Sequence, residues 1–265
     1  MPRVARARVS MVSSIHPMAT KDEIKYYASL KQKKAREESG LFIAEGRKIV
    51  AEGLKSPCEC ARLFVKAGTP KSDPDVASLL EGWSYETLGE LDFDRISDTE
   101  NSQGVIGIFD YRKLIIQKPT ADRLIALFDL ADPRNMGTIT RTCDWFGIKE
   151  LLIGETCVDL FNPKTIRSTM GSIFHTRFIL SKNLVDELGR YRETYKIVTA
   201  DVAGTDYRAF DYSGKGIYVF SNEARGPSDG ILAATDEVVT IPGGGKAESL
   251  NVASAASIIV ARIFG

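Results

Sequence analysis

Residues 241–251 read Ile-Pro-Gly-Gly-Gly-Lys-Ala-Glu-Ser-Leu-Asn and join a predicted strand to a predicted helix. The apolar run 237–241 predicts a short buried strand, which Pro242 ends. Ser249 or Asn251 can cap a helix over 252–264, whose interior is rich in Ala and Ile. A strand, a glycine loop and a helix N-terminus together form a site for a ligand that needs backbone donors. A tight turn without a ligand is the alternative.

The glycine loop does not have the spacing of a nucleotide triphosphate loop. That motif needs a glycine at the position of Thr240 and a hydroxyl side chain at the position of Ala247. The stretch is therefore not a nucleotide triphosphate loop.

The bulk composition is that of an ordinary globular protein. The chain has 265 residues, which suits one large or two small domains. No run approaches about 18 apolar residues, so no membrane-spanning helix is expected. The four cysteines form no CxxC pair, and only two histidines accompany them. We therefore expect no metal site and no disulfide framework, and a reducing cytoplasm fits the sequence.

Positive charge gathers at the N-terminus. Residues 1–36 hold nine Lys or Arg against two acidic residues, a net of +7, and the remainder carries −7. A basic segment on an acidic body suits contact with nucleic-acid phosphates, and a solvated tail and helix face is the alternative. Residues 1–20 contain no acidic residue, and a disordered tail is favoured there over a transit peptide or an upstream start.

Short elements alternate from residue 22 to residue 111 and predict a small α/β unit. A helix over 22–34 has Ile24, Tyr27 and Leu30 on one side and lysines on the other. The elements expected after it are strands at 41–45, 61–65 and 105–109 and helices at 47–53, 75–80 and 88–96. Residues 113–122 are the predicted linker.

The second unit begins with an apolar strand at 124–128, of the kind that a parallel sheet buries on both faces. The elements expected after it are strands at 150–153, 196–200 and 217–221, a helix that Asn135 caps and that runs to 146, and a helix at 184–195. This alternation predicts a parallel α/β domain with ligands at the carboxyl ends of the strands. Three polar, glycine-bearing loops follow such strands, at 132–137, 221–226 and 242–251, and we expect them to converge on one crevice.

Motifs in these loops resemble those of the SpoU-type, TrmH-like branch of the SPOUT RNA methyltransferases. The first, at 132–142, reads Asp-Pro-Arg-Asn-Met-Gly-Thr-Ile-Thr-Arg-Thr. The second, Ser-Asn-Glu-Ala-Arg-Gly, has Ser221 where the family has glycine. The third, at 241–252, has Gly243 where the family commonly has methionine. Segments 41–46 and 167–174 are also similar to the family, so the resemblance covers nearly the whole chain after residue 20.

The resemblance implies an α/β protein whose C-terminal domain, 123–265, is a parallel-sheet SPOUT domain with a deep trefoil knot. A small α/β RNA-binding domain at 21–112 precedes it. The family further implies a homodimer whose active site forms at the interface. S-adenosylmethionine is the implied cofactor, and methyl transfer to a ribose 2′-hydroxyl is the implied reaction.

The resemblance also assigns site residues. The catalytic positions are Asn135, Arg141, Glu223, Ser249 and Asn251. The positions that line the cofactor, largely through backbone groups, are Ala200, Ser221, Glu223, Gly226, Ile241, Pro242 and Leu250. The two amides suit orienting a ribose. Arg141 is a poor base and suits gripping a phosphate and stabilising an alkoxide, and the partner subunit can supply it. Glu223 orients Arg141 or the loop, or else caps the helix after Gly226.

The N-terminal domain would grip RNA phosphates, which positions the RNA without reading its sequence. The residues assigned to this contact are Lys31, Lys33, Lys34 and Arg36. Ribosomal RNA is favoured over transfer RNA as the substrate. A knotted RNA-binding or assembly factor without catalysis is the alternative, against which the complete set of catalytic positions argues. A dinucleotide-dependent Rossmann enzyme is excluded, because residues 132–135 occupy the place of its first glycine loop.

Overall fold

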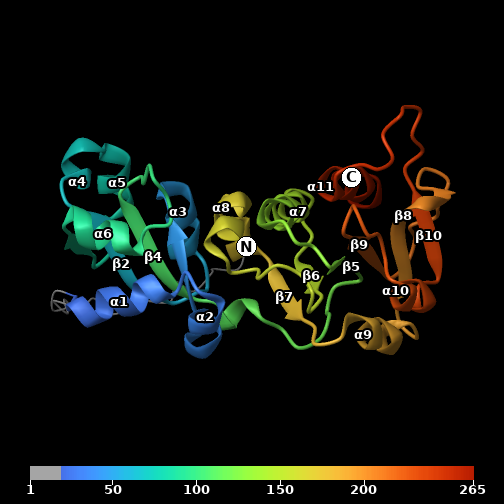
Figure 1. The fold of residues 1–265 in the computed structure, drawn as a ribbon, viewed down its shortest axis with the longest axis horizontal. Helices are drawn as coiled ribbons and strands as arrows, with labels where there is room; N and C mark the ends of the chain where they lie inside the picture. Colours follow the sequence, from blue (N-terminus) through green and yellow to red (C-terminus); the bar gives the residue numbers. More distant parts are fainter. Residues whose placement is uncertain (1–18) are drawn as a thin grey trace, which may run out of the picture.

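The computed structural model describes residues 19–265, which form two α/β domains along one long axis (Figure 1). Each domain is built on its own sheet, one of four strands and one of six. The predicted basic tail, 1–20, lies almost entirely outside the described residues.

The N-terminal sheet is mixed, with the strand order β1-β4-β2-β3. Strand β4 is antiparallel to β1 and β2, whereas β3 is parallel to β2. The elements are α1 (Lys21–Ser29), α2 (Lys33–Ser39), β1 (Leu41–Glu45), α3 (Arg47–Lys55), β2 (Cys60–Lys66), α4 (Thr69–Ser72), α5 (Pro74–Leu79), β3 (Glu86–Leu88), α6 (Glu90–Ile96), β4 (Val105–Asp110) and the 3-10 turn η1 (Arg112–Leu114). The strands expected in this domain are confirmed. Strand β3 was not expected, because its three residues are too few to show an alternating pattern.

The single helix expected at 22–34 is two helices. Helix α1 ends after Ser29, and the chain turns at Leu30, whose side chain is fully buried. The turn leaves the Leu30 carbonyl free to accept a hydrogen bond of 2.7 Å from Arg36 Nη1. Burial of Leu30 and this bond replace the helical bonds that a continuous helix would make.

The C-terminal sheet is entirely parallel, with the strand order β10-β8-β9-β5-β6-β7. Its elements are β5 (Arg123–Phe128), α7 (Pro133–Trp145), β6 (Glu150–Ile153), α8 (Pro163–Thr169), η2 (Ser172–His175), β7 (Arg177–Leu180), α9 (Leu184–Tyr191), β8 (Lys196–Asp206), β9 (Gly216–Ser221), α10 (Asp229–Ala234), β10 (Glu237–Thr240) and α11 (Val252–Phe264). The predicted parallel domain is confirmed. Strand β8 runs six residues past its expected end at residue 200, and the edge strand β7 was not among the expected strands.

Different helices cover the two faces of this sheet. Residues on β5 alternate between them: Ile125 and Leu127 belong to the core with α7 and α11, whereas Leu124 and Ala126 belong to the core with α9 and α10. All four side chains are fully buried. This two-sided burial explains why the strand is a continuous apolar run.

The two domains share one hydrophobic core. Phe42 and Phe109 of the N-terminal sheet pack on Phe174, with ring centroids 5.6 and 5.0 Å apart. Tyr111 stacks on Phe161 at 4.1 Å. These phenylalanines belong to a cluster that continues into the C-terminal sheet. The sheets are therefore held in one body rather than hinged at a linker.

Ion pairs add to this contact between the domains. Arg36 reaches from α2 to Asp159, with Nε donating over 2.9 Å. Arg167 Nη1 donates to Asp98 over 2.9 Å. Each pair joins one domain to the other.

Within residues 19–265, no helix is long and apolar enough to cross a membrane. The trefoil knot stays a prediction.

We expect Gly53→Ala to weaken the contact between the domains. A Cβ at Gly53 would lie 2.5 Å from Phe109 Cζ and 2.7 Å from Phe174 Cζ. Two buried rings would have to shift, so urea denaturation should show a loss of about 1–3 kcal/mol in the free energy of unfolding. Gly189→Ala in α9 is the matched control, because a Cβ there meets nothing within 4 Å. The control should gain about 0.5–1 kcal/mol from helix propensity. An equal gain in both variants would contradict the tight contact.

Candidate active site

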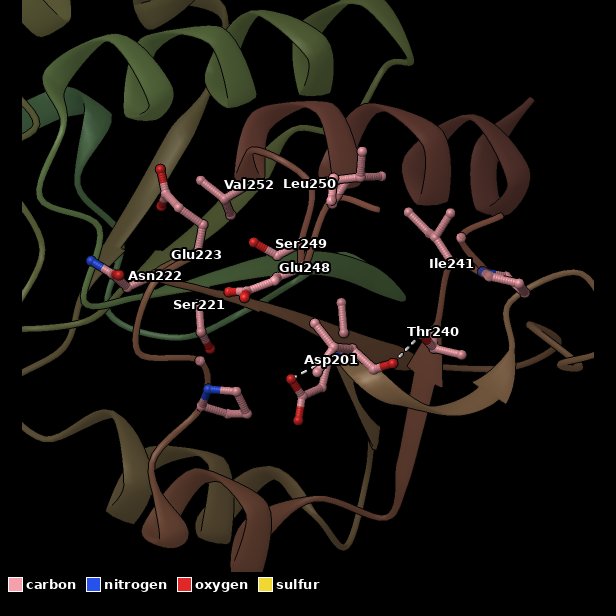
Figure 2. Close-up of a pocket in the computed structure, with 18 of the residues that line it drawn as sticks. Asp201, Ser221, Asn222, Glu223, Thr240, Ile241, Glu248, Ser249, Leu250 and Val252 are labelled. Atoms are coloured by element: carbon pink, nitrogen blue, oxygen red, sulfur yellow. Dashed lines mark hydrogen bonds between the residues drawn. The ribbon is translucent and has the colours of Figure 1, made fainter. Parts of the chain in front are cut away.

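A cavity of about 490 Å³ lies at the carboxyl ends of β8, β9 and β10, beside the N-terminus of α11 (Figure 2). Figure 1 shows that these elements lie at the end of the molecule away from the N-terminal sheet. The lining includes every residue predicted to line a cofactor: Ala200, Ser221, Glu223, Gly226, Ile241, Pro242 and Leu250. Loops 221–226 and 242–251 form most of the cavity wall, and the hydrogen bonds of Asn135 bring loop 132–137 to them.

The glycines of the C-terminal loop leave room for a ligand. A Cβ at Gly243, Gly244 or Gly245 would meet no atom within 4 Å, and none of the three has a positive φ. Their backbone angles are therefore not of the left-handed kind that favours glycine. Without side chains, these glycines let a ligand in the cavity approach the backbone closely. Gly243 and Gly245 line the cavity.

Side chains from the three loops form a hydrogen-bond chain at the edge of the cavity. Asn251 Nδ2 donates to Asn135 Oδ1 over 3.1 Å, and Asn135 Nδ2 donates to Glu223 Oε1 over 3.1 Å. Asn251 Oδ1 accepts from the Ala253 N–H at 3.0 Å, as the N-cap of α11. Because a backbone N–H can only donate, the cap fixes the Asn251 amide and so the direction of the whole chain. Asn251, rather than Ser249, is the cap.

Asn135 itself does not cap a helix, which corrects the sequence-based expectation. Helix α7 begins at Pro133, and the side chain of Asp132 accepts from the Arg134 N–H as the N-cap. Pro133 suits the first helical position because its missing N–H is not needed there. The Arg134 side chain and then its backbone N–H lower the pKa of Asp132 below its ordinary value. Asn135 is thus left free in the first turn to face the other loops.

The loop after β9 is fixed by Asn222. Its Oδ1 accepts from the N–H groups of Ala224 and Arg225 at 2.9 and 3.2 Å, and its Nδ2 donates to the Asp129 carbonyl at 3.1 Å. Asn222 therefore ties the end of β9 to the end of β5.

Glu223 does not act as a helix cap. Ser228 caps α10 through the Ile231 N–H. The Glu223 carboxylate is thus available to the cavity and to Asn135.

Arg141 is not among the residues that line the cavity. It is six residues beyond Asn135 on α7, which turns it to another face by about 240°. Its side chain is exposed and makes no hydrogen bond or ion pair within the described part of the chain. Ser249 does line the cavity. The other catalytic positions thus gather at the cavity, and Arg141 does not.

The basic residues assigned to RNA are of two kinds. Lys33 and Lys34 are exposed and pair with Glu37 and Glu38 on the same helix at 3.7 and 3.8 Å. Lys31 is half-buried and pairs with no carboxylate among residues 19–265.

Arg36 is a correction to the assigned RNA contacts. Its side chain is 2% exposed and paired with Asp159 of the other domain, so it is not available to phosphate.

An irregularity in β8 places residues that the sequence reasoning missed. Strand β10 pairs with β8 through Val238–Thr199 and then Val239–Thr205, so residues 200–204 bulge outward. The bulge brings Asp201 into the cavity wall, where Glu248 of the last loop also lies. A Cβ at Gly204 would lie 2.5 Å from the Val238 carbonyl oxygen. A glycine just after an apolar strand was the available signal for this bulge.

The lining indicates the kind of ligand. It contains carboxylates and no Lys, Arg or His, so it offers no side-chain cation to a phosphate. Within residues 19–265, no cluster of His, Cys, Asp and Glu could hold a metal ion. The fold and the site define an α/β protein with a cavity for a ligand at the strand ends and a network of amide and carboxylate groups beside it for a polar substrate.

The chain belongs to the SpoU rRNA methylase family, whose model matches residues 122–261. A model of the MRM3-like substrate binding domain matches residues 21–107. The resemblance drawn from the three motifs is thereby confirmed.

Relatives match along nearly the whole chain. The 23S rRNA (guanosine(2553)-2′-O)-methyltransferase RlmP of Bacillus subtilis is 34% identical over 253 residues, which cover 93% of this chain and 98% of that protein. A TrmH-family RNA methyltransferase structure from Porphyromonas gingivalis is 30% identical, with a TM-score of 0.80 over 93% of this chain and 98% of that one. An AdoMet-bound rRNA methyltransferase from Sinorhizobium meliloti is 29% identical, with a TM-score of 0.73 over 89% of this chain and 92% of that one. Both domains are therefore shared with these relatives.

Two changes at Asn251 separate its cap from its place in the hydrogen-bond chain. Asn251→Asp keeps an oxygen for the N–H groups of α11 but has no N–H to donate to Asn135. Its free energy of unfolding should stay within about 0.5 kcal/mol of wild type, whereas Asn251→Ala should lose about 1 kcal/mol. Urea denaturation measures both values. Equal losses in the two variants would show that Asn251 does not stabilise the helix as a cap.

Proposed function

We propose that this protein transfers a methyl group from S-adenosylmethionine to a ribose 2′-hydroxyl of ribosomal RNA. The observation that carries the proposal is the hydrogen-bond network of Asn251, Asn135 and Glu223. It lies beside a cavity whose lining among residues 19–265 includes no Lys, Arg or His. The relative from Bacillus subtilis is named for 23S rRNA. Large-subunit ribosomal RNA is accordingly the first substrate to test, ahead of transfer RNA.

The residues of the cavity fit the proposed cofactor. Ser221 Oγ is buried and makes no hydrogen bond within the described residues, so a ligand can supply its missing partner. Gly243 and Gly245 leave their backbone open to the cavity. S-adenosylmethionine, when bound, supplies a methyl group attached to a positively charged sulfur.

The amides and the carboxylate of the hydrogen-bond chain have groups left for a substrate. Asn135 and Asn251 each keep one amide N–H that can donate to a ribose oxygen. Glu223 holds Asn135 through Oε1, and its Oε2 makes no hydrogen bond within residues 19–265. That oxygen can accept the proton that the ribose 2′-hydroxyl gives up. The cap of α11 holds these groups in the fixed geometry that an in-line transfer requires.

A second copy of the chain would complete the site. Arg141 points away from its own cavity, and α7 also carries Trp145, which is 84% exposed. The helix packed against α7 adds the exposed Ile258, and Leu250 lies just before it. An exposed apolar surface beside an unpaired arginine fits a symmetric dimer, in which Arg141 of each chain serves the partner's cavity. There it would bind the RNA phosphate and stabilise the developing alkoxide.

The N-terminal domain would hold the RNA. Lys33 and Lys34 make only surface ion pairs, which phosphates can replace at little cost. Lys31 joins them, and Arg36 does not. The four cysteines are free, which fits a reducing compartment, so we place the reaction in the cytoplasm.

Label transfer tests the reaction. Wild-type protein should move labelled methyl from S-adenosylmethionine to ribosomal RNA and make one ribose linkage resistant to alkali. Asn135→Ala should lower kcat by about 100-fold or more, because it removes positioning groups used in the transition state. The exposed change Glu193→Ala is the control and should leave kcat unchanged. Label on a base, or a fully active Asn135→Ala, would contradict the mechanism.

Mixed dimers test where Arg141 acts. Arg141→Ala and Asn135→Ala should each be nearly inactive alone. If the partner supplies Arg141, one site of a mixed dimer is intact. Random co-assembly should therefore restore about a quarter of wild-type activity. No recovery in mixed dimers confirmed by mass spectrometry would place both residues in the same chain's site.

A further inference from the structure

The cavity wall contains more carboxylates than the one that takes part in the hydrogen-bond network. Asp201, Glu223 and Glu248 line it, and no cationic side chain does. Glu223 is engaged by Asn135. Asp201 Oδ1 accepts from the Val202 N–H at 2.7 Å, which leaves Oδ2 without a partner among the described residues. The carboxylates of Asp201 and Glu248 therefore have no assigned role.

Ser221 lines the same cavity as Asp201 and marks its wall as a contact surface. Strands β8 and β9 pair up to Thr199–Val219, and Asp201 and Ser221 each lie two residues beyond that pair. Ser221 is only 7% exposed, and its Oγ has no hydrogen-bond partner among residues 19–265. Figure 2 shows that Ser221, Asp201 and Glu248 surround the same cavity. A buried orphan hydroxyl at this point indicates that a ligand group reaches it.

We propose that Asp201, with the Ser221 hydroxyl beside it, contacts the cofactor by side chain and selects S-adenosylmethionine over S-adenosylhomocysteine by charge. This inference rests on the proposed function. It adds a side-chain contact where the resemblance implies mainly backbone contacts, and it uses the serine that replaces the family's glycine.

The chemistry of the cofactor supplies the selection. S-adenosylmethionine carries a sulfonium and an ammonium against one carboxylate, a net charge of +1. Transfer of the methyl group leaves a neutral thioether, so the product has a net charge of zero. A carboxylate in the cavity attracts the reactant cofactor more strongly than the product. The same carboxylate therefore favours loading of the reactive form and release of the spent one.

Calorimetric binding of the two cofactor forms tests the proposal without any RNA. Asp201→Asn should raise the Kd of S-adenosylmethionine about fivefold and that of S-adenosylhomocysteine about twofold or less, as expected for one partly exposed charge pair. Sinefungin, which keeps a positive amine near the position of the sulfonium, should follow S-adenosylmethionine. Ser221→Ala should raise the Kd of both cofactor forms alike, about fivefold, because a neutral hydrogen bond does not sense the charge.

Two controls separate local charge from net charge and from misfolding. Asp229→Asn removes the same charge at an exposed position outside the cavity wall and should leave both Kd values unchanged. Asp201→Glu keeps the charge and should retain the wild-type preference. Equal changes for both cofactor forms in Asp201→Asn, or none, would overturn the charge selection while the proposed function stands. Absence of binding of either form by folded wild-type protein would overturn both.

Discussion

Two backbone N–H groups at the start of α11 determine the direction of every hydrogen bond in the side-chain network of the site. They require an acceptor, so they hold the oxygen of the Asn251 amide and turn its nitrogen toward Asn135. Asn135 must then present its own nitrogen to Glu223. A helix cap thus determines which groups of two further loops remain free for a substrate. The three loops follow different strands of the sheet, and this chain of bonds is what joins their side chains.

Much of the fold could be predicted because it depends on local pattern. The run at 124–128 is apolar on both faces, and the strand it forms is buried on both sides. The glycine-bearing loops follow strands of one parallel sheet, whose topology brings their ends together. Residues separated by long stretches of chain were beyond such reasoning. Arg36 follows three lysines in the sequence, and only the fold shows that Asp159 of the other domain holds it. The bulge in β8 likewise depends on its pairing with β10.

The site divides into a part that one chain builds and a part that it leaves open. The cavity and the amides come from loops of a single chain, and hydrogen bonds between their side chains hold the loops together. Arg141 lies on an exposed surface, where no packing within the described chain restrains it. The fixed groups suit holding a cofactor and a ribose. Arg141 suits binding a phosphate, which it can reach from a second copy of the chain.

The aromatic contact between the domains has a consequence for target choice. With Gly53 pressed against Phe109 and Phe174, and Tyr111 stacked on Phe161, the N-terminal domain, which carries the lysines, is held in place relative to the cavity. If the lysines hold an RNA, as proposed, the protein sets the distance from them to the cavity. The distance between these two parts of the protein is fixed. On the proposed function, such a protein would select a nucleotide by its distance from another feature of the folded RNA.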